Sequence, residues 1–326
     1  METLIIGAGA MGCIFGAALT AGGHAVTFYD VDQNKVDTLN QNGLVITEPN
    51  GSQKTYPASA VFLIEDAPAP ELAIILVKSY STAQAARELS LVKKAKTQVL
   101  SLQNGLGHIS TLAQYLDEKQ IFPGVTYQAA YEIGPGQIHH SGNGPTTISP
   151  LIRNSHHRTP NSPRLLKNSL SKAMDLACLL NNCGIPAAAS TDLKPIRWQK
   201  LIVNSAINPL SALHNLPNGE LPKNPEIARD MMALVTEGVT VAQKDGVSLN
   251  YGEIWANVLE TCRATAQNHS SMLSDVTRGR VTEIEAINGS IARLGEQYGV
   301  DTPINTCMVR GVVAIHGRND QIRLNQ

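Results

Sequence analysis

Residues 7–12 of the chain, Gly-Ala-Gly-Ala-Met-Gly, restrict the fold more than any other segment of the sequence. They directly follow the apolar residues 4–6 and open a helical pattern over residues 10–21 that ends at two glycines. In this context Gly7 permits a tight turn, Gly9 lets the backbone approach a pyrophosphate, and Gly12 lets helix and strand pack closely. The turn therefore predicts a dinucleotide site at a helix N-terminus. We expect the cofactor-binding residues of this turn to be Gly7, Gly9, Ala10, Met11 and Gly12.

The second predicted strand, residues 24–30, ends at an acidic residue. Asp30 follows Gly12 by 18 residues, and a carboxylate there accepts hydrogen bonds from the adenosine ribose and repels a 2′-phosphate. This favours NAD as the cofactor over NADP without excluding NADP. The alternative is that Asp30 is a turn residue that starts the next helix, since Asp32 and Asn34 lie close by.

Two further apolar runs, residues 72–77 and 99–102, alternate with helical patterns, as is typical of a parallel sheet covered on both faces. Residues 124–149 are rich in Gly, Pro, Thr and Tyr, and we expect antiparallel strands there at the edge of the sheet. After about residue 190 the pattern is helical, and the expected long helices cover residues 194–213, 225–245, 251–273 and 278–298. The predicted fold class is α/β: an N-terminal Rossmann-type doubly wound sheet over residues 1–190 and a C-terminal all-α helical domain over residues 191–326.

The charge balance and the cysteines exclude several classes of function. The 326 residues include 26 Lys+Arg and 27 Asp+Glu, which gives a formal net charge of −1, and only 4% aromatic residues. Nucleic-acid binders need a basic face or aromatic platforms, so no nucleic-acid partner is expected. Five scattered cysteines without a CxxC pair suggest neither a zinc site nor disulfides, and they favour a cytoplasmic protein. No metal is expected at His139 and His140, because adjacent residues of a strand point to opposite faces.

Residues 3–23 carry no charge and are long enough to span a bilayer. However, they contain six glycines, and Glu2 replaces the basic residues that a signal peptide needs. With a second strand directly after them, these residues are predicted to form a strand, a turn and a helix, and no membrane segment.

A polar stripe runs along the helix predicted after residue 194. Lys200, Asn204 and Asn208 are spaced by four residues, while their neighbours are nearly all apolar. A helix that is apolar except for one polar stripe is buried, and the stripe then faces a partner or a cleft. A solvated face would carry Glu and Lys rather than two Asn, which are poor helix formers. The stripe therefore predicts that Lys200, Asn204 and Asn208 face a partner or a cleft.

Seven motifs, in order along almost the whole chain, are GAGAMG at 7–12, LVK ending at Lys78, QNG around Asn104, WQKLIVNSAINPL at 198–210, NGEL at 218–221, NHSSML at 268–273 and TEIEAING at 282–289. Together they resemble the ketopantoate reductases (2-dehydropantoate 2-reductases). The resemblance implies a Rossmann domain joined to a helical domain, with the substrate in the cleft between them. In that family a nicotinamide cofactor delivers hydride to the keto carbon of ketopantoate, a small 2-keto acid, which forms (R)-pantoate.

The resemblance also implies roles for individual residues. Lys200 would be the general acid, and Glu283 would orient this lysine or a substrate hydroxyl, although its charged neighbours alone would make Glu283 a surface residue. Lys78 and Asn104 match residues beside the nicotinamide and the substrate. Asn268 and Ser271 are expected to share one face of a helix. The expected substrate-binding residues are Asn204, Asn208, Asn218, Asn268 and Ser271.

Asp30 departs from the family pattern, because many of these reductases use NADPH and carry a basic residue near the end of the second strand. One alternative is therefore an NAD-dependent D-2-hydroxyacid dehydrogenase of the same build, acting on branched-chain or aromatic 2-keto acids. The β-hydroxyacid dehydrogenases share the glycine-rich turn and a Lys-x₃-Asn motif but match residues 208–220 and 283–288 less well. A non-catalytic dinucleotide sensor would not need Lys200, Asn204 and Glu283 together. The polar insert at 153–163 has no assigned function, and the long apolar C-terminal helices allow a homodimer.

Overall fold

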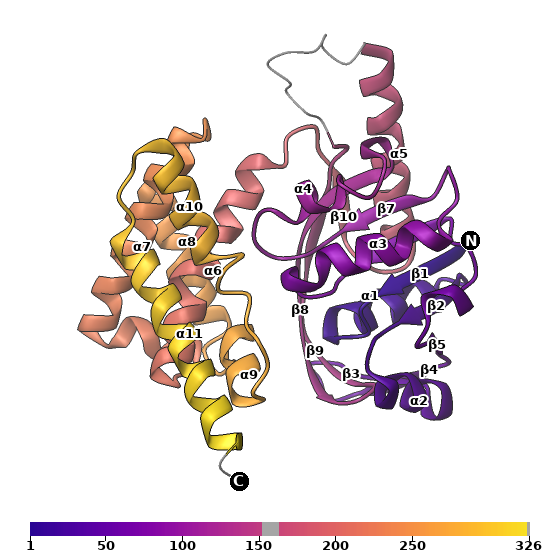
Figure 1. Ribbon diagram of the computed structural model, residues 1–326, viewed down its shortest axis with the longest axis horizontal. Helices are drawn as coiled ribbons and strands as arrows, with labels where there is room; N and C mark the ends of the chain where they lie inside the picture. The colour runs from indigo at the N-terminus through magenta and orange to yellow at the C-terminus, as the bar shows by residue number, and fades with distance from the viewer. Residues whose placement is uncertain (152–162, 325–326) are drawn as a thin grey trace. The chain divides into compact units, whose positions relative to one another are not determined.

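The computed structural model describes residues 1–151 and 163–324 and divides the chain into two compact units (Figure 1). The first unit comprises Met1–Gln103 and His108–Leu193, and the second comprises Asn104–Gly107 and Lys194–Gln326. Most of the polar insert, residues 153–162, lies outside the described residues. Among the described residues, no helix is long and apolar enough to cross a membrane.

The first unit is built on one ten-stranded mixed sheet with the strand order β4-β3-β9-β8-β7-β6-β1-β2-β5, and β10 pairs with β9. Strands β8, β7, β6, β1, β2 and β5 all pair in parallel, as predicted from the alternating apolar runs. Almost all side chains of β6 and β7 are buried on both faces, which is why these runs are continuously apolar rather than alternating. The strands are β1 (Glu2–Ile6), β2 (Ala25–Tyr29), β3 (Leu44–Thr47), β4 (Gln53–Tyr56), β5 (Ser59–Val61), β6 (Leu72–Ile75), β7 (Gln98–Ser101), β8 (Ile121–Gly134), β9 (Gln137–Ile148) and β10 (Ala187–Ala189).

The antiparallel pair predicted over residues 124–149 is present as β8 and β9, but its predicted place at the sheet edge is wrong. Strand β9 also pairs in parallel with β3, and β3 pairs with β4. Strand β4 forms the edge, and its residues Gln53, Lys54 and Thr55 are exposed. Polar and charged side chains on a short edge strand discourage further strand pairing. The apolar Ile138 and Ile148 of β9 are fully buried instead.

The helices of the first unit cover both faces of the sheet, which confirms the doubly wound prediction (Figure 1). Successive residues of β1 point to opposite faces: Ile5 packs in a core with α1, α2 and α5, whereas Leu4 and Ile6 pack in a core with α3 and α4. Both cores are therefore apolar, and each strand must be apolar on both sides. The helices are α1 (Ala10–Ala21), α2 (Gln33–Asn42), α3 (Thr82–Val92), α4 (His108–Leu112) and α5 (Pro163–Asn182).

The described residues of the second unit form helices and connecting loops without a strand, as predicted, and the core of this unit surrounds α6. Leu201, Ile202, Ala206 and Ile207 of α6 are all buried in that core, so this helix is internal rather than amphipathic at the surface. The elements are α6 (Lys194–His214), the 3₁₀ segment η4 (Asn218–Lys223), α7 (Pro225–Lys244), α8 (Tyr251–Ala264), α9 (Ser271–Thr277), α10 (Asn288–Tyr298) and α11 (Pro303–Leu324).

Two of the predicted helices are shorter in the structure than their predicted ranges. The helix predicted over 251–273 ends at Ala264, and α9 begins separately at Ser271 because Ser270 is its N-cap and accepts from the N–H of Leu273 (3.0 Å). The helix predicted over 278–298 begins only at Asn288. Gly279 has a φ of +61°, a conformation that ends α9 and that a helix cannot continue through. Asn268 lies before α9, so the prediction that Asn268 and Ser271 share a helix face is wrong.

A buried hydrogen-bond network holds the middle of α6. Pro209 has no N–H, so the carbonyl of Ser205, four residues earlier, lacks its usual helical donor. Asn288, which is fully buried, supplies that donor through Nδ2 (3.1 Å) and also donates to Oδ1 of Asn305 (3.0 Å). Glu237 of α7 accepts from the side chain of Asn305 (2.7 Å). The proline in the middle of α6 is therefore tolerated because α7, α10 and α11 supply polar partners.

Candidate active site

The glycine-rich turn between β1 and α1 has three glycines with three different constraints. Gly7 has a φ of +100°, and a Cβ there would lie 3.0 Å from the backbone nitrogen of Val77. A Cβ on Gly12 would lie 2.0 Å from the carbonyl oxygen of Gly7. A Cβ on Gly9 would meet nothing within 4 Å. Packing within the protein therefore explains Gly7 and Gly12, whereas Gly9 borders open space at the N-terminus of α1, where a dinucleotide can approach.

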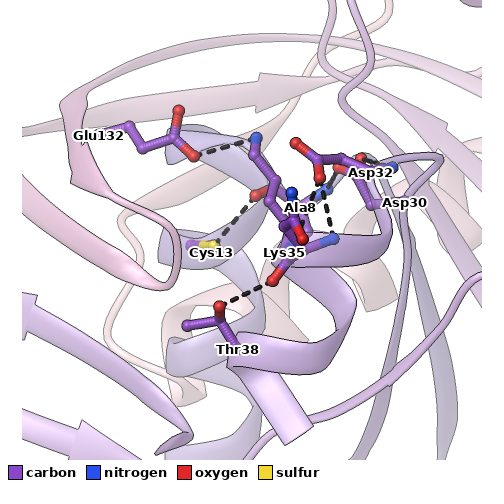
Figure 2. A network of polar contacts seen from close by, with 8 residues as sticks. Ala8, Cys13, Asp30, Asp32, Lys35, Thr38 and Glu132 are labelled. Carbon is purple, nitrogen blue, oxygen red and sulfur yellow. Dashed lines mark hydrogen bonds and ion pairs between the residues drawn. The ribbon is translucent and has the colours of Figure 1, made fainter.

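The carboxylate of Asp30 lies beside this turn (Figure 2). Its Oδ2 accepts from the N–H of Ala8 (2.8 Å), and its Oδ1 accepts from the N–H of Asp32 (3.0 Å). Asp32, not Asp30, is the N-cap of α2, because its Oδ1 accepts from the N–H of Asn34 (3.0 Å). The capping role that the sequence left open for Asp30 thus belongs to Asp32. Each oxygen of Asp30 keeps a lone pair that can accept from a ribose hydroxyl.

A buried ion pair lies behind the turn and had no signal in the sequence. Nζ of Lys35 on α2 is 3.0 Å from Oε1 of Glu132 on β8 (Figure 2). The thiol of Cys13 donates to the carbonyl of Ala8 (3.5 Å), and burial raises the pKa of Cys13 to about 12. Cys13 is therefore a protonated packing residue. Lys35 and Glu132 are 97 residues apart (132 − 35) and each has ordinary polar neighbours in the sequence, so only the tertiary structure brings them together.

Lys78 directly follows Val77 at the carboxyl end of β6. The buried side chain of Gln103 donates to the carbonyl of Val77 (2.9 Å) and to Oγ1 of Thr82 (2.7 Å). One amide thus ties the ends of β6 and β7 to the start of α3. Parallel sheets bind ligands outside the carboxyl ends of their strands, so Gln103 stabilises the edge from which Lys78 emerges.

The loop Asn104–Gly107 packs with the second unit. The N–H of Leu106 donates to the carbonyl of Ala286 (3.1 Å). Gly105 has a φ of +80°, and a Cβ there would lie 2.3 Å from the same oxygen. The N–H of Ala286 in turn donates to the carbonyl of Glu283 (3.0 Å). The loop therefore brings Asn104 next to the turn that carries Glu283.

Lys200 of α6 and Glu283 interact electrostatically within the second unit. Burial of the ammonium lowers the pKa of Lys200 to about 8, and the negative charge of Glu283 partly opposes this shift. Glu283 lies in the turn before α10 and is only 7% exposed, so the surface position suggested by its charged sequence neighbours is wrong. A lysine with a pKa near neutrality can exist in either protonation state and can act as a proton donor.

The predicted substrate-binding residues fall into two connected groups and one outlier. Asn204 and Asn208 follow Lys200 at one-turn intervals along α6. Asn218 and Asn268 form the second group, because the N–H of Asn218 donates to the carbonyl of Asn268 (3.0 Å). Oγ of Ser270 donates to the carbonyl of Asn208 (3.3 Å) and links the two groups. The outlier, Ser271, is exposed, whereas its neighbour Ser270, which the sequence did not single out, is buried.

His139 and His140 are occupied by other contacts. The ring of His139 stacks on Tyr131 with the centroids 4.8 Å apart. His140 contacts Oε2 of Glu48 through Nδ1 (3.2 Å) and Oε1 of Gln128 through Nε2 (2.8 Å). Within residues 1–151 and 163–324, no group of three or more His, Cys, Asp or Glu side chains could hold a metal ion.

Two family models match the chain, one for each unit. The model "Ketopantoate reductase PanE/ApbA" matches residues 3–152, and its C-terminal counterpart matches residues 192–316. A 2-dehydropantoate 2-reductase of Archaeoglobus fulgidus is 32% identical over 94% of this chain and 96% of its own length. One of Halobacterium salinarum is 30% identical over 93% of this chain and 95% of its own length.

Similar solved structures include a D-mandelate dehydrogenase and a ketopantoate reductase. D-mandelate dehydrogenase with NADH and anilino(oxo)acetate is similar with a TM-score of 0.89 and 27% identity, covering 98% of this chain and 99% of the other. A PanE/ApbA family ketopantoate reductase from Ralstonia eutropha has a TM-score of 0.85 and 29% identity, covering 98% and 100% of the two chains. With both family models spanning most of the sequence, the chain belongs to the ketopantoate reductase family.

Proposed function

We propose that the protein reduces a 2-keto acid, with ketopantoate as the leading substrate and (R)-pantoate as the product, by hydride transfer from a nicotinamide cofactor. The observation that carries this proposal is the buried Lys200 of α6, whose pKa is lowered to about 8 by burial and whose ammonium interacts electrostatically with Glu283 in the turn before α10. Such a lysine is suited to proton transfer near neutral pH. The family membership and the relatives named 2-dehydropantoate 2-reductase support the same reaction.

In the proposed reaction the cofactor and the protein side chains have separate tasks. When bound, the reduced nicotinamide supplies the hydride that reaches the keto carbon. Lys200 hydrogen-bonds the keto oxygen, stabilises the negative charge that develops on it, and transfers a proton from Nζ to give the hydroxyl. Glu283 keeps Lys200 protonated, because its negative charge raises the pKa of the ammonium. The remaining polar residues act as neutral donors and acceptors that hold the keto acid: Asn204, Asn208, Asn218, Asn268 and Ser271.

For the cofactor, we infer a site on the glycine-rich turn, where Gly9 leaves space for the pyrophosphate. Gly7, Ala10, Met11 and Gly12 shape the turn and the first residues of α1. Asp30 holds the turn through Ala8 and favours NADH, because its charge repels a 2′-phosphate. Lys78 and Asn104 act beside the nicotinamide. We place this enzyme in the cytoplasm. A homodimer is one candidate for its assembly.

A second candidate is an NAD-dependent D-2-hydroxyacid dehydrogenase. Asp30 at the end of β2 and the similarity to D-mandelate dehydrogenase with NADH favour it. Steady-state rates with NADH and NADPH against ketopantoate, 2-ketoisovalerate and phenylglyoxylate separate the two candidates. Preference for ketopantoate supports the first, and preference for either other acid supports the second. No turnover of any 2-keto acid with either cofactor contradicts both.

Asp30→Ala is expected to raise the NADPH-to-NADH affinity ratio by about 10-fold, because one repulsive charge beside the 2′-phosphate is removed. Dissociation constants for both cofactors, from quenching of protein fluorescence, give the ratio. Asp30→Asn is the matched variant, since it loses the charge but keeps an oxygen that can accept from Ala8. If neither substitution changes the ratio, Asp30 does not determine cofactor preference.

The rate of keto acid reduction is expected to fall as pH rises through about 8, the pKa of Lys200. The general acid must be protonated, so activity is present below that pKa and is lost above it. Glu283 raises this pKa, so Glu283→Gln should move the fall to lower pH. Profiles of kcat/KM against pH for both proteins test this. A profile that stays unchanged in Glu283→Gln contradicts the coupling between the two residues.

A further inference from the structure

Asn218 is held rigidly against the segment that follows α8. Its N–H donates to the carbonyl of Asn268 (3.0 Å), and the N–H of Gly219 donates to the carbonyl of Ala266 (3.1 Å). A Cβ on Gly219 would lie 2.6 Å from the Cβ of Ala266, so only glycine permits this close approach. The backbone of Asn218 is therefore fixed, and its side chain has few ways to point.

Thr265 decides which end of the Asn218 amide points away from it. Oγ1 of Thr265 donates its single proton to the carbonyl of Thr261 (2.7 Å). Toward Asn218 this oxygen can then only accept, and it accepts from Nδ2 at 2.9 Å. A flipped amide would place two acceptors against each other. Thr265 thus forces the nitrogen of Asn218 inward and leaves Oδ1 facing the other way.

Oδ1 of Asn218 is buried and accepts no hydrogen bond within the described protein. The whole residue is only 7% exposed. Buried carbonyl oxygens in native proteins almost always have a donor, so an orphan of this kind needs an explanation, and a ligand is one. The segment 265–268 leads directly to Ser270, which donates to the carbonyl of Asn208 on the polar stripe of α6. Oδ1 of Asn218 therefore lies in a segment that is connected to the proposed substrate site on α6.

We propose that Thr265 is a positioning residue that presents Asn218 as a hydrogen-bond acceptor, so that the site selects a 2-keto acid carrying a hydroxyl group. The carboxylate and the keto oxygen of the substrate are acceptors and cannot satisfy Oδ1. A hydroxyl is a donor and can. Ketopantoate has such a hydroxyl on C4, whereas 2-ketoisovalerate and phenylglyoxylate have none. The inference rests on the proposed 2-keto acid reduction and names the substrate class within it.

The test compares ketopantoate with 3,3-dimethyl-2-oxobutanoate, which has the same branched skeleton without the hydroxyl. The wild-type protein is expected to favour ketopantoate by at least about 100-fold in kcat/KM, since a site built around a substrate hydroxyl rejects analogues that lack it. Thr265→Val keeps the branched shape and removes the acceptor. It is expected to lower kcat/KM for ketopantoate by about 10-fold, mainly through KM, and to change the value for the analogue by less than about threefold.

Two further variants separate positioning from stability. Thr265→Ser retains the hydroxyl and should restore the preference for ketopantoate. Thr261→Val is the matched control one turn earlier, in α8, because the hydroxyl of Thr261 donates to the carbonyl of Asn257 (2.7 Å). It should leave the preference unchanged, and the melting temperatures of all variants report any loss of stability.

Equal losses with both substrates in Thr265→Val would mean that Thr265 is merely structural, and no loss with either would mean that the orientation of Asn218 does not matter. Both outcomes overturn the inference while the wild-type enzyme stays active. A wild-type preference for the analogue also overturns it. A wild-type protein that reduces neither acid contradicts the proposed function itself, and the inference fails with it.

Discussion

Lys200→Ala is expected to lower kcat for keto acid reduction by about 10²- to 10⁴-fold, the range for loss of a general acid. Without the ammonium of Lys200, the proposed site lacks the group that stabilises the developing negative charge and the group that donates the proton. Binding of the dinucleotide to the glycine-rich turn should persist, because Lys200 belongs to the helical unit and the turn to the other. Single-turnover rates and cofactor dissociation constants measured on the same preparations test both statements.

The alanine variant also leaves Glu283 buried without its positive neighbour, so a general loss of stability must be separated from a loss of chemistry. The double variant Lys200→Ala with Glu283→Gln removes both charges and serves as that control, since an uncompensated buried charge is what destabilises. It should remain as slow as the single variant but melt at a higher temperature. Near-normal turnover in either variant contradicts the assignment of Lys200 as the acid.

Gly12→Ala is expected to have the second largest effect, because its Cβ would lie 2.0 Å from the carbonyl oxygen of Gly7. Neither atom is on a flexible side chain, so α1 and the turn must move apart. Overpacking of this kind lowers the free energy of unfolding by about 1–3 kcal/mol or more. Displacing the N-terminus of α1 also removes the phosphate-binding N–H groups from their place. Chemical denaturation and cofactor titration measure the two effects.

Gly9→Ala is the matched comparison, because a Cβ at Gly9 meets no protein atom within 4 Å. Its stability should equal that of the wild type, whereas cofactor affinity should fall by about 100-fold if the pyrophosphate lies against this position. Loss of affinity without loss of stability identifies Gly9 as a residue that faces the ligand. Unchanged affinity would show that the dinucleotide does not bind over this turn.

The Rossmann-type half was predictable because its signals are local. Residues 7–12 contain a turn whose glycines have direct steric reasons, and apolar runs such as residues 72–77 indicate strands buried on both faces. The edge of the sheet was not predictable in this way. Strand β4 is short and polar, and only its pairing with β3 makes it a strand at all. The predicted helix boundaries were wrong at Ser270 and Gly279. Ser270 starts α9 and Gly279 follows its end, although the sequence pattern looks continuously helical there.

The sequence by itself determined the fold class, the dinucleotide turn and the polar stripe with Lys200, because each depends on residues within one or two helical turns of one another. Only the tertiary structure decided which polar side chains meet. It buries Glu283 beside Lys200, assigns helix capping to Asp32 rather than Asp30, and gives Asn218 one free acceptor through Thr265. These outcomes depend on burial and hydrogen-bond direction between segments far apart in the chain, which no local pattern contains.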